Sequence, residues 1–387
     1  VLDGTSRADL QKIKARKDGI VAESVHGIET GFRDHPNITF IRGEASFVSD
    51  YEIRVNRTSY TAPKIFINVG ARALIPAEYR DAEYLTNESI LELTELPEHL
   101  LIIGGSYIGL EFGQLFRRFG SRVTILERSS QIINREDADV SQAIRESLEN
   151  DGVAFCLDAQ NLRAEGTSGN IRVHYEREGQ EHRVTGTHLL LAIGRTPNTD
   201  LLNLEATHIL TDKRGYVSVD DFCETHVKGI FALGDCNGKG AFTHTAYNDF
   251  EIVVSALLEG KKRKISDRIQ TYGLFVDPPL GRAGMTKNEA LEKGLKVREA
   301  FMEMKHIRRA VEKGETRGFI RILVNEQDHI IGASVLGVGG DEIISGILNL
   351  MVAKSPYTLL RDTVVLHPTV SELIPTALGK LKDISIT

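Results

Sequence analysis

The sequence has no apolar run approaching the roughly 18 residues that a membrane-spanning helix needs, and its first residues do not resemble a signal peptide. An excess of positive charge is also missing, because 47 basic residues stand against 54 acidic ones and give a net charge of -7. This balance argues against a protein that binds nucleic acid or anionic membranes. We therefore expect neither a nucleic-acid partner nor a membrane partner.

Cysteine is scarce as well: the chain has 3, Cys156, Cys223 and Cys236, and they lie far apart in the sequence. A disulfide scaffold needs more cysteines at closer spacing, so this usage favours a reducing, cytoplasmic location. We interpret all three as small buried residues. The histidines show no metal-ligand spacing with a nearby acid, and we expect no metal site.

A length of 387 residues allows two to three domains of about 100–200 residues each. Apolar residues make up 41% and charged residues 26%, as in an ordinary globular protein. Near the N-terminus, a charged stretch at residues 7–16 is compatible with a helix. Alternating or apolar segments then predict short strands at residues 38–41, 45–48, 51–55 and 64–70.

The middle of the sequence alternates between strands and helices. The apolar run at residues 100–103 predicts a buried strand of a parallel sheet, and a helix is expected at 107–119. The further elements that we expect are strands at 122–127, 152–155 and 189–194, a helix at 138–149, a hairpin at 171–176 and 181–185, strands at 216–219 and 229–235, and a helix at 245–259. Residues 269–387 have mixed α+β character, with strands at 319–324 and 330–336 and a helix at 340–352.

A glycine-rich turn follows the strand at residues 100–103. It has a G-x-G-x-x-G pattern with serine at the second glycine, made of Gly104, Gly105, Ser106, Tyr107, Ile108 and Gly109. The first glycine allows a tight turn, the second position admits a pyrophosphate to the backbone, and the last lets the helix pack on the strand. The helix N-terminus offers N–H groups and partial positive charge to phosphates. The turn predicts a dinucleotide site, with a purely structural turn as the alternative.

The predicted nucleotide site includes an acidic residue, Glu127, at the end of the next strand. It lies about twenty residues after the turn, where a carboxylate accepts hydrogen bonds from a ribose. A carboxylate there would repel a 2′-phosphate, so the sequence favours NAD over NADP. The neighbouring Arg128 keeps NADP possible.

Near the C-terminal end, His367 is followed five residues later by Glu372. A carboxylate can fix the tautomer of an imidazole and raise its basicity, which suits general acid–base catalysis near neutral pH. Such a spacing alone is more often structural than catalytic. Because the pair follows a nucleotide fingerprint and a Gly234-Asp235 turn, the catalytic interpretation is favoured.

In order along the chain, several segments resemble the class I pyridine nucleotide-disulfide oxidoreductases, which include lipoamide dehydrogenase, glutathione reductase and mercuric reductase. The segments are the strand that ends at Gly70, the turn at 104–109, A-I-G-R-T-P-N at 192–198, G-I-F-A-L-G-D at 229–235, and the His367–Glu372 pair. Residues 278–286 look most like the mercuric-reductase-like branch. The resemblance covers essentially the whole sequence.

The resemblance implies an α/β fold with two nested Rossmann-like, dinucleotide-binding domains and a C-terminal α+β dimerisation domain. Residues 1–78 would be an incomplete first part of the FAD-binding domain, and 199–268 its second part. Residues 79–198 would bind NAD(P), and 269–387 would form the dimer interface.

The resemblance also implies the cofactors FAD and NAD, with NADP possible, and a homodimer that acts on a small-molecule or thiol/disulfide substrate. Asp235 would bind the ribityl chain of FAD, and a helix beginning near His244 would face the pyrimidine end of the flavin. The other residues expected to bind a cofactor are Gly70, Gly194, Gly234, Phe242, Thr243 and Ala246. His367, with Glu372, would reach the flavin of the partner subunit and act as acid–base for a thiol.

Two features of that family are missing from the sequence: a first FAD fingerprint and a C-x-x-x-x-C redox pair. We expect both upstream of Val1. Without them, the alternative is a non-catalytic NAD-binding fragment that lacks FAD. A second alternative is a flavin reductase of a metal ion or a quinone, which has less need of a histidine–glutamate pair.

Overall fold

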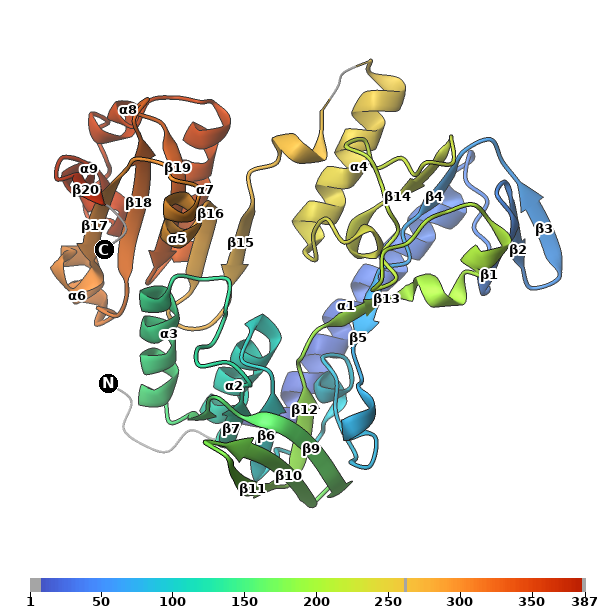
Figure 1. Cartoon of the computed structure of the whole chain (residues 1–387), viewed down its shortest axis with the longest axis horizontal. Helices are drawn as coiled ribbons and strands as arrows, with labels where there is room; N and C mark the ends of the chain where they lie inside the picture. Colours follow the sequence, from blue (N-terminus) through green and yellow to red (C-terminus); the bar gives the residue numbers. More distant parts are fainter. Residues whose placement is uncertain (1–7, 261–262, 385–387) are drawn as a thin grey trace. The chain divides into compact units, whose positions relative to one another are not determined.

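The computed structural model describes residues 8–260 and 263–384 (Figure 1). These residues form two compact units: unit 1 contains residues 8, 75–193 and 269–384, and unit 2 contains residues 9–74 and 194–268, apart from 261–262. The finer, four-part division expected from the sequence stays a prediction. No helix in the described part of the chain is both long and apolar enough to cross a membrane.

A four-stranded parallel sheet with the order β12-β6-β7-β8 lies at the centre of one part of unit 1. Its strands are β6 (His99–Ile103), β7 (Arg122–Leu126), β8 (Ala154–Cys156) and β12 (His188–Leu191). The helices α2 (Tyr107–Phe119) and α3 (Ala138–Asn150) connect successive strands. A three-stranded antiparallel sheet is inserted before β12 and consists of β9 (Gln160–Thr167), β10 (Asn170–Arg177) and β11 (Gln180–Gly186).

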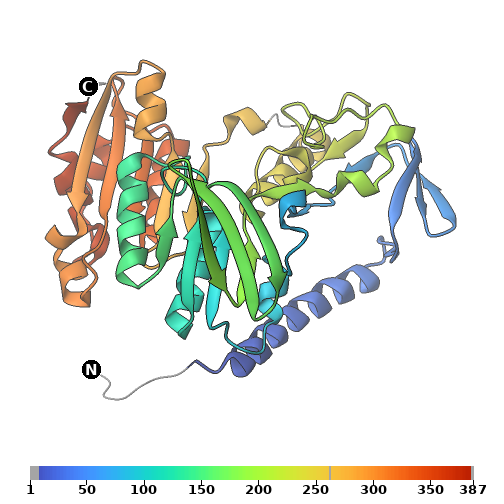
Figure 2. The same ribbon diagram turned by 60° about the horizontal axis from the view of Figure 1, so that its bottom comes forward.

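Both faces of the parallel sheet are buried, because successive residues of a strand point to opposite sides. Leu100 and Ile102 of β6 belong to the core that includes side chains of α2 and α3. Leu101 and Ile103 pack instead with side chains of the β9–β11 sheet, which covers the other face (Figure 2). Burial on both faces explains why residues 100–103 form an uninterrupted apolar run.

The second part of unit 1 is a six-stranded sheet with the order β15-β16-β19-β18-β17-β20. Its strands are β15 (Thr271–Leu274), β16 (Leu280–Gly284), β17 (Val297–Glu303), β18 (Phe319–Asn325), β19 (Ile330–Leu336) and β20 (Lys382–Ile384). The helices are α5 (Lys287–Glu292), α6 (Arg308–Lys313), α7 (Gly340–Val352), α8 (Thr358–Arg361) and α9 (Ile374–Leu378). Helix α7 lies so close to β16 that a Cβ on Gly281 would be 2.2 Å from the carbonyl oxygen of Gly340.

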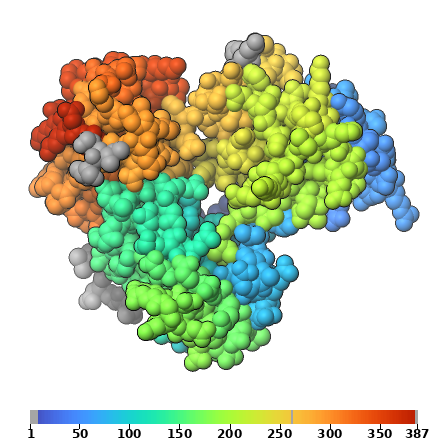
Figure 3. Space-filling view, viewed as in Figure 1, coloured from blue at the N-terminus to red at the C-terminus, as the bar shows by residue number. Residues whose placement is uncertain are grey.

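Ion pairs formed by two buried arginines connect the two parts of unit 1. Arg321 of β18 is 2% exposed and pairs with Asp139 of α3. Arg282 of β16 is 1% exposed, and its Nη2 lies 3.3 Å from Oε2 of Glu136, just before α3. In the space-filling view, the surface around α3 adjoins that of the six-stranded part (Figure 3). A guanidinium removed from water in this way needs an anionic partner. Each pair therefore favours one particular arrangement of the two parts against each other.

Unit 2 is built around two parallel strands, β4 (Ile65–Ile67) and β14 (Ile230–Ala232), which pair over their full length. A second, antiparallel ladder joins β5 (Ala71–Ala73) to β13 (Arg195–Pro197). The other elements are α1 (Leu10–Asp34), the meander β1 (Ala45–Ser49), β2 (Glu52–Val55) and β3 (Thr58–Thr61), and α4 (Thr243–Leu258). The carboxyl ends of β4 and β14 therefore meet at one edge.

Several expected elements are confirmed, among them α2, α3 and α7, but two expected strands are wrong. Residues 38–41 form no strand, and residues 216–219 contribute only a bridge between Thr211 and Val217. Alternating apolar residues favour an extended chain, but a strand also needs a neighbour to complete its hydrogen bonds. The first helix extends to Asp34, well beyond residue 16, whereas Arg7 lies outside the described residues.

Candidate nucleotide and flavin sites

The glycine-rich turn lies at the carboxyl end of β6, in the centre of the parallel sheet. Gly104 has φ +109°, and a Cβ there would lie 2.4 Å from the carbonyl oxygen of Ala192. A Cβ on Gly109 would lie 2.0 Å from the carbonyl oxygen of Gly104. Ser106 is different: it is the N-cap of α2 with φ -114°, a conformation open to any residue. The structure thus requires glycine at 104 and 109 and accepts serine at 106.

Glu127 follows β7 and reaches the same turn. Its Oε2 accepts a hydrogen bond from the N–H of Gly105 at 2.7 Å, and its Oε1 accepts one from Ser129 at 3.0 Å. The predicted acidic residue and the predicted turn are therefore brought together. In a dinucleotide site of this pattern, an acidic residue at the end of the second strand accepts hydrogen bonds from the ribose. Arg128 is exposed, and its carbonyl oxygen accepts a hydrogen bond from Gln160 at 2.5 Å.

The first helical residue of the fingerprint, Tyr107, points toward the six-stranded part of unit 1. Its ring meets the ring of Tyr272 edge-on, with 5.4 Å between centroids, and the guanidinium of Arg135 lies 5.2 Å from its centroid. Burial raises the pKa of Tyr107. The neighbouring Ile108 is half-buried against the core shared with α2 and α3.

In unit 2, the residues expected to hold FAD gather at the carboxyl ends of β4 and β14. The N–H of Leu233 donates to the carbonyl oxygen of Ile67 at 2.9 Å, which brings the two strand ends together. Gly70 follows one strand with φ +68°, and Gly234 follows the other with φ +69°. Ligands of parallel sheets bind at this edge of the strands.

Asp235 belongs to that edge and has a partner that the sequence interpretation missed. Nε of Arg195 lies 3.3 Å from Oδ2 of Asp235, and the guanidinium also donates to the carbonyl oxygen of Ala71. Gly194, with φ +140°, precedes this arginine. The sequence did contain a hint of this role. In the A-I-G-R-T-P-N segment at 192–198, Arg195 is the charged residue next to Gly194, a glycine expected to bind a cofactor. The pair places a cation among the residues predicted to contact FAD.

Helix α4 begins at Thr243, close to the expected start. A Cβ on Gly234 would lie 3.2 Å from Cβ of Ala246, so the helix N-terminus and the Gly234-Asp235 turn are neighbours. Oγ1 of Thr245 accepts a hydrogen bond from the N–H of Phe242 at 3.2 Å. The ring of His244 stacks on that of Phe242, with 5.3 Å between centroids. The partial positive charge of a helix N-terminus favours an anionic group nearby.

The His367–Glu372 pair is formed in unit 1. Nδ1 of His367 lies 2.7 Å from Oε2 of Glu372. The same oxygen accepts a hydrogen bond from the N–H of Thr369 at 3.3 Å, and Oγ1 of Thr369 donates to the carbonyl oxygen of Leu366 at 2.7 Å. The imidazole is 76% exposed and the carboxylate 11%, so the ring is accessible while its partner is held.

The cysteines show no reactive environment. Cys236 is fully buried beside the carbonyl oxygens of Leu233 and Ile67, and burial raises the pKa of its thiol. Burial also raises the pKa of Cys223 to about 12. Cys156, at the end of β8, lies 3.7 Å from the hydroxyl of Tyr175. A reactive cysteine needs the opposite shift, toward the thiolate.

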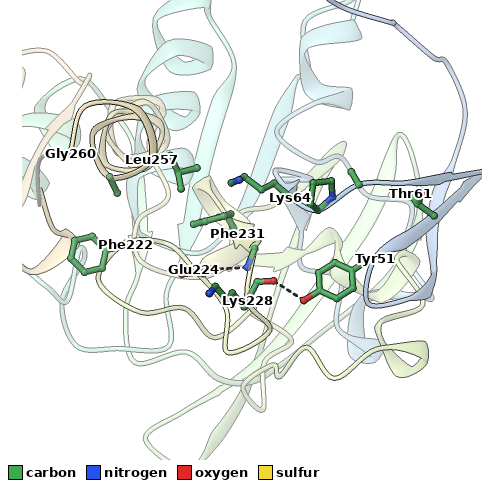
Figure 4. A pocket seen from close by; sticks show the side chains of 13 residues that line it. Tyr51, Thr61, Lys64, Phe222, Glu224, Lys228, Phe231, Leu257 and Gly260 are labelled. Atoms are coloured by element: carbon green, nitrogen blue, oxygen red, sulfur yellow. Dashed lines mark hydrogen bonds between the residues drawn. The ribbon is translucent and has the colours of Figure 1, made fainter.

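Unit 2 also has a pocket with a volume of about 1040 Å³ (Figure 4). It contains none of the predicted site residues, and it lies near the beginnings of β4 and β14. The hydroxyl of Tyr51 donates to the carbonyl oxygen of Lys228 at 2.8 Å, and Glu224 accepts a hydrogen bond from Gly229. This pocket is therefore distinct from the group of residues predicted to contact FAD.

Comparison with known proteins decides the family. Residues 4–249 match the description "pyridine nucleotide-disulphide oxidoreductase", and residues 271–378 match the dimerisation domain of the same family. The chain belongs to the pyridine nucleotide-disulphide oxidoreductase family. The family of the sequence prediction and its fold class are thereby confirmed.

Individual relatives agree with this family. The chain is 35% identical to the probable pyridine nucleotide-disulfide oxidoreductase RclA of Escherichia coli (strain K12), over 96% of this chain and 86% of the relative. It is 32% identical to a mercuric reductase of Staphylococcus aureus, over 88% of this chain and 63% of the relative. The structure of the HOCl-induced flavoprotein disulfide reductase RclA from Escherichia coli matches with a TM-score of 0.88 and 34% identity, over 96% of this chain and 86% of that one.

Membership of the family makes the chain an oxidoreductase of the NAD(P)H-dependent flavoprotein disulfide reductase type, with FAD and NAD(P)H as cofactors. The geometry fits both groups. A Cβ on Gly104 or Gly109 would overlap a backbone carbonyl oxygen, and the carboxylate of Glu127 accepts a hydrogen bond from Gly105 of the same turn. Asp235 and the N-terminus of α4 stand together beyond the parallel strands of unit 2.

Proposed function

We propose that this chain transfers electrons from NADH, by way of bound FAD, to a disulfide or another thiol-linked acceptor, with His367 and Glu372 as its acid–base pair. The observation that carries the proposal is the 2.7 Å contact between Nδ1 of His367 and Oε2 of Glu372, with the imidazole exposed. The acceptor is a small-molecule or thiol substrate, and the protein works as a homodimer in the cytoplasm. A matched dimerisation domain supports the homodimer.

NADH is preferred over NADPH because Glu127 is held at the glycine-rich turn by two backbone N–H groups. A carboxylate fixed in this way can accept ribose hydroxyls and repels a phosphate on the 2′-oxygen. The exposed Arg128 is the nearest feature that would favour NADPH. The preference is therefore set by one carboxylate.

In unit 2, Gly70, Gly194, Gly234, Asp235 and residues 242–246 would hold FAD. When bound, FAD supplies the two-electron redox chemistry, and the protein supplies orientation and charge. Asp235 can accept hydrogen bonds from hydroxyl groups, and the N-terminus of α4 favours negative charge nearby. Arg195 neutralises Asp235 in the same place.

His367 would accept a proton from the thiol of the substrate or donate one to it. Glu372 is an acceptor, so Nδ1 of the ring carries a proton and donates it in the hydrogen bond, which leaves Nε2 as the basic nitrogen. Nε2 takes a proton from a thiol or returns it to a thiolate. The N–H of Thr369 holds Glu372 in place, so the ring keeps its orientation between the two protonation states.

An anaerobic titration of the purified protein with NADH tests the proposal. We expect the visible flavin band to bleach and the reduced protein to release thiols from a disulfide substrate. Bleaching without thiol release, but with rapid reduction of a metal ion or a quinone, would support the flavin-reductase alternative instead. A protein that takes up NADH but neither binds nor reduces FAD would support the nucleotide-binding alternative.

A further inference from the structure

Helix α4 contains a buried carboxylate that is not among the residues predicted to contact FAD or NAD. Asp249 is 1% exposed and lies on the second turn of the helix that begins at Thr243. A carboxylate buried to this degree costs free energy unless it is hydrogen-bonded and paired with a charge. Its partners therefore show what the residue holds in place.

Both oxygens of Asp249 are occupied. Oδ2 accepts a hydrogen bond from the N–H of Gly234 at 2.9 Å and another from Nδ2 of Asn237 at 2.9 Å. The same Nδ2 donates to the carbonyl oxygen of Ala232, the last residue of β14, at 3.0 Å. Oδ1 pairs with the guanidinium of Arg268. One side chain thus links the end of β14, the Gly234-Asp235 turn and helix α4.

The charge of Asp249 strengthens this link. Hydrogen bonds from neutral donors to an ionised carboxylate are stronger than those to a neutral acceptor. Arg268 balances the buried charge and is itself oriented by Asn248, whose Oδ1 accepts from its Nε at 2.9 Å. Because a buried ion pair is weak evidence for added stability, the network is better explained by the geometry that it fixes. The turn that it fixes contains Gly234 at φ +69°.

We propose that Asp249 is a positioning residue for FAD. By holding the N–H of Gly234, it presents the neighbouring Asp235 to the ribityl chain and keeps the N-terminus of α4 against the same turn. The inference rests on the binding of FAD by unit 2. Asp249 itself does not contact the cofactor, and it acts through the backbone of residue 234.

The test compares Asp249→Asn with Asp212→Asn in the full chain, by titrating FAD and following the quenching of its fluorescence. Asp212 is a matched control because its carboxylate also accepts two backbone hydrogen bonds, from Arg214 at 2.8 Å and Tyr216 at 3.0 Å. We expect Asp249→Asn to weaken FAD binding by about tenfold to a hundredfold, the usual effect of disturbing a buried, charge-assisted network. Asp212→Asn should bind FAD as the unsubstituted protein does.

A double variant separates positioning from stability. Asp249→Asn leaves Arg268 buried and unpaired, whereas Asp249→Asn with Arg268→Gln removes that charge. We expect the double variant to recover most of the lost thermal stability of the apoprotein without recovering FAD affinity. Recovery of both, or an Asp249→Asn affinity within twofold of the unsubstituted protein, would overturn the proposal.

Hydrogen exchange of the Gly234 amide gives a readout that does not need FAD. It should quicken in Asp249→Asn and not in Asp212→Asn, and unchanged exchange would contradict the positioning role. If the unsubstituted chain itself binds no FAD, the proposed function fails, whereas the exchange result still decides whether Asp249 holds the turn.

Discussion

Arg195 and Asp235 form an ion pair at the edge where the two parallel strands of unit 2 end, with 3.3 Å between Nε and Oδ2. Their side chains are 29% and 20% exposed, so the pair is accessible to a ligand but partly shielded from water. The pair gives this edge both a cation and an anion. A phosphate-bearing cofactor with a polyhydroxyl chain needs both.

Replacing Arg195 by methionine should therefore weaken FAD binding, by about tenfold, because one charge-assisted interaction is lost from the edge. The measurement is the dissociation constant for FAD at two salt concentrations, and the variant should lose part of the salt dependence. Arg72→Met is the control, since Arg72 forms an exposed ion pair with Asp200 next to the same β5–β13 ladder. Equal losses in the two variants would contradict a specific role for Arg195.

Replacing Glu127 by glutamine should change the coenzyme preference. Loss of the carboxylate removes the repulsion of a 2′-phosphate and weakens ribose binding, so the ratio of kcat/KM for NADH over NADPH should fall by about tenfold. Steady-state rates with the two coenzymes measure this ratio. Glu146→Gln on the exposed side of α3, where Glu146 accepts a hydrogen bond from Gln142, should leave it unchanged. A ratio that stays constant in Glu127→Gln would mean that selection lies elsewhere.

Replacing His367 by alanine should slow the thiol step and spare the reduction of the flavin by NADH. Losing a general acid–base group typically lowers a rate by about 10²–10⁴-fold. Stopped-flow bleaching by NADH measures the first step, and turnover with a disulfide measures the second. His208→Ala is a close control, because Nδ1 of His208 lies 2.8 Å from Oδ2 of Asp50 in a similar exposed pair. A slowed first step in His367→Ala would contradict the assignment.

The Asp139–Arg321 pair should contribute to stability at neutral pH and lose that contribution in acid. Burial raises the pKa of Asp139, but the hydrogen bond and charge of Arg321 outweigh it and hold the pKa below the ordinary value of 3.8. As the pH falls, Asp139 is therefore protonated in the unfolded chain before it is protonated in the folded one. The contribution of the pair to stability is complete above pH 3.8 and disappears as the pH falls through the folded-state pKa of Asp139.

Asp139→Asn should thus lower the free energy of unfolding at neutral pH, by about 1 kcal/mol, since half of the carboxylate is exposed and screened. As the pH falls below 3.8 and through the folded-state pKa of Asp139, the variant and the unsubstituted protein should converge. Urea unfolding at the two pH values measures both effects. Asp362→Asn, which removes an exposed carboxylate paired with Arg361, should change little at either pH. A difference that persists in acid would point to lost packing in place of lost charge.

The elements around the nucleotide turn could be predicted from the sequence because their signals are local. A buried apolar run, a glycine turn and a 3.6-residue periodicity follow one another, and α2 occupies residues 107–119 as expected. The spacing of that motif placed Glu127 in the same predicted site as the turn, and its carboxylate accepts a hydrogen bond from Gly105. His367 and Glu372 were likewise found because five residues separate them.

The parts that the sequence interpretation missed depend on partners distant in the chain. Arg195 reaches Asp235 because β13 returns to pair with β5, and nothing near residue 195 specifies that ladder. The same reason underlies the wrong strand at residues 38–41, where an extended pattern met no neighbouring strand among the described residues. Asp249 was unnoticed because it resembles any polar residue of a helix until Gly234 and Arg268 are placed beside it.

The three signature positions of the nucleotide turn differ in the freedom that they leave to mutation. At 104 and 109 any side chain would overlap a carbonyl oxygen, whereas Ser106 has an ordinary extended backbone. A library randomised over this turn should return glycine alone at the two outer positions and a range of small residues in the middle. The serine that interrupts the pattern thus occupies the position at which the motif can change in sequence without loss of the nucleotide site.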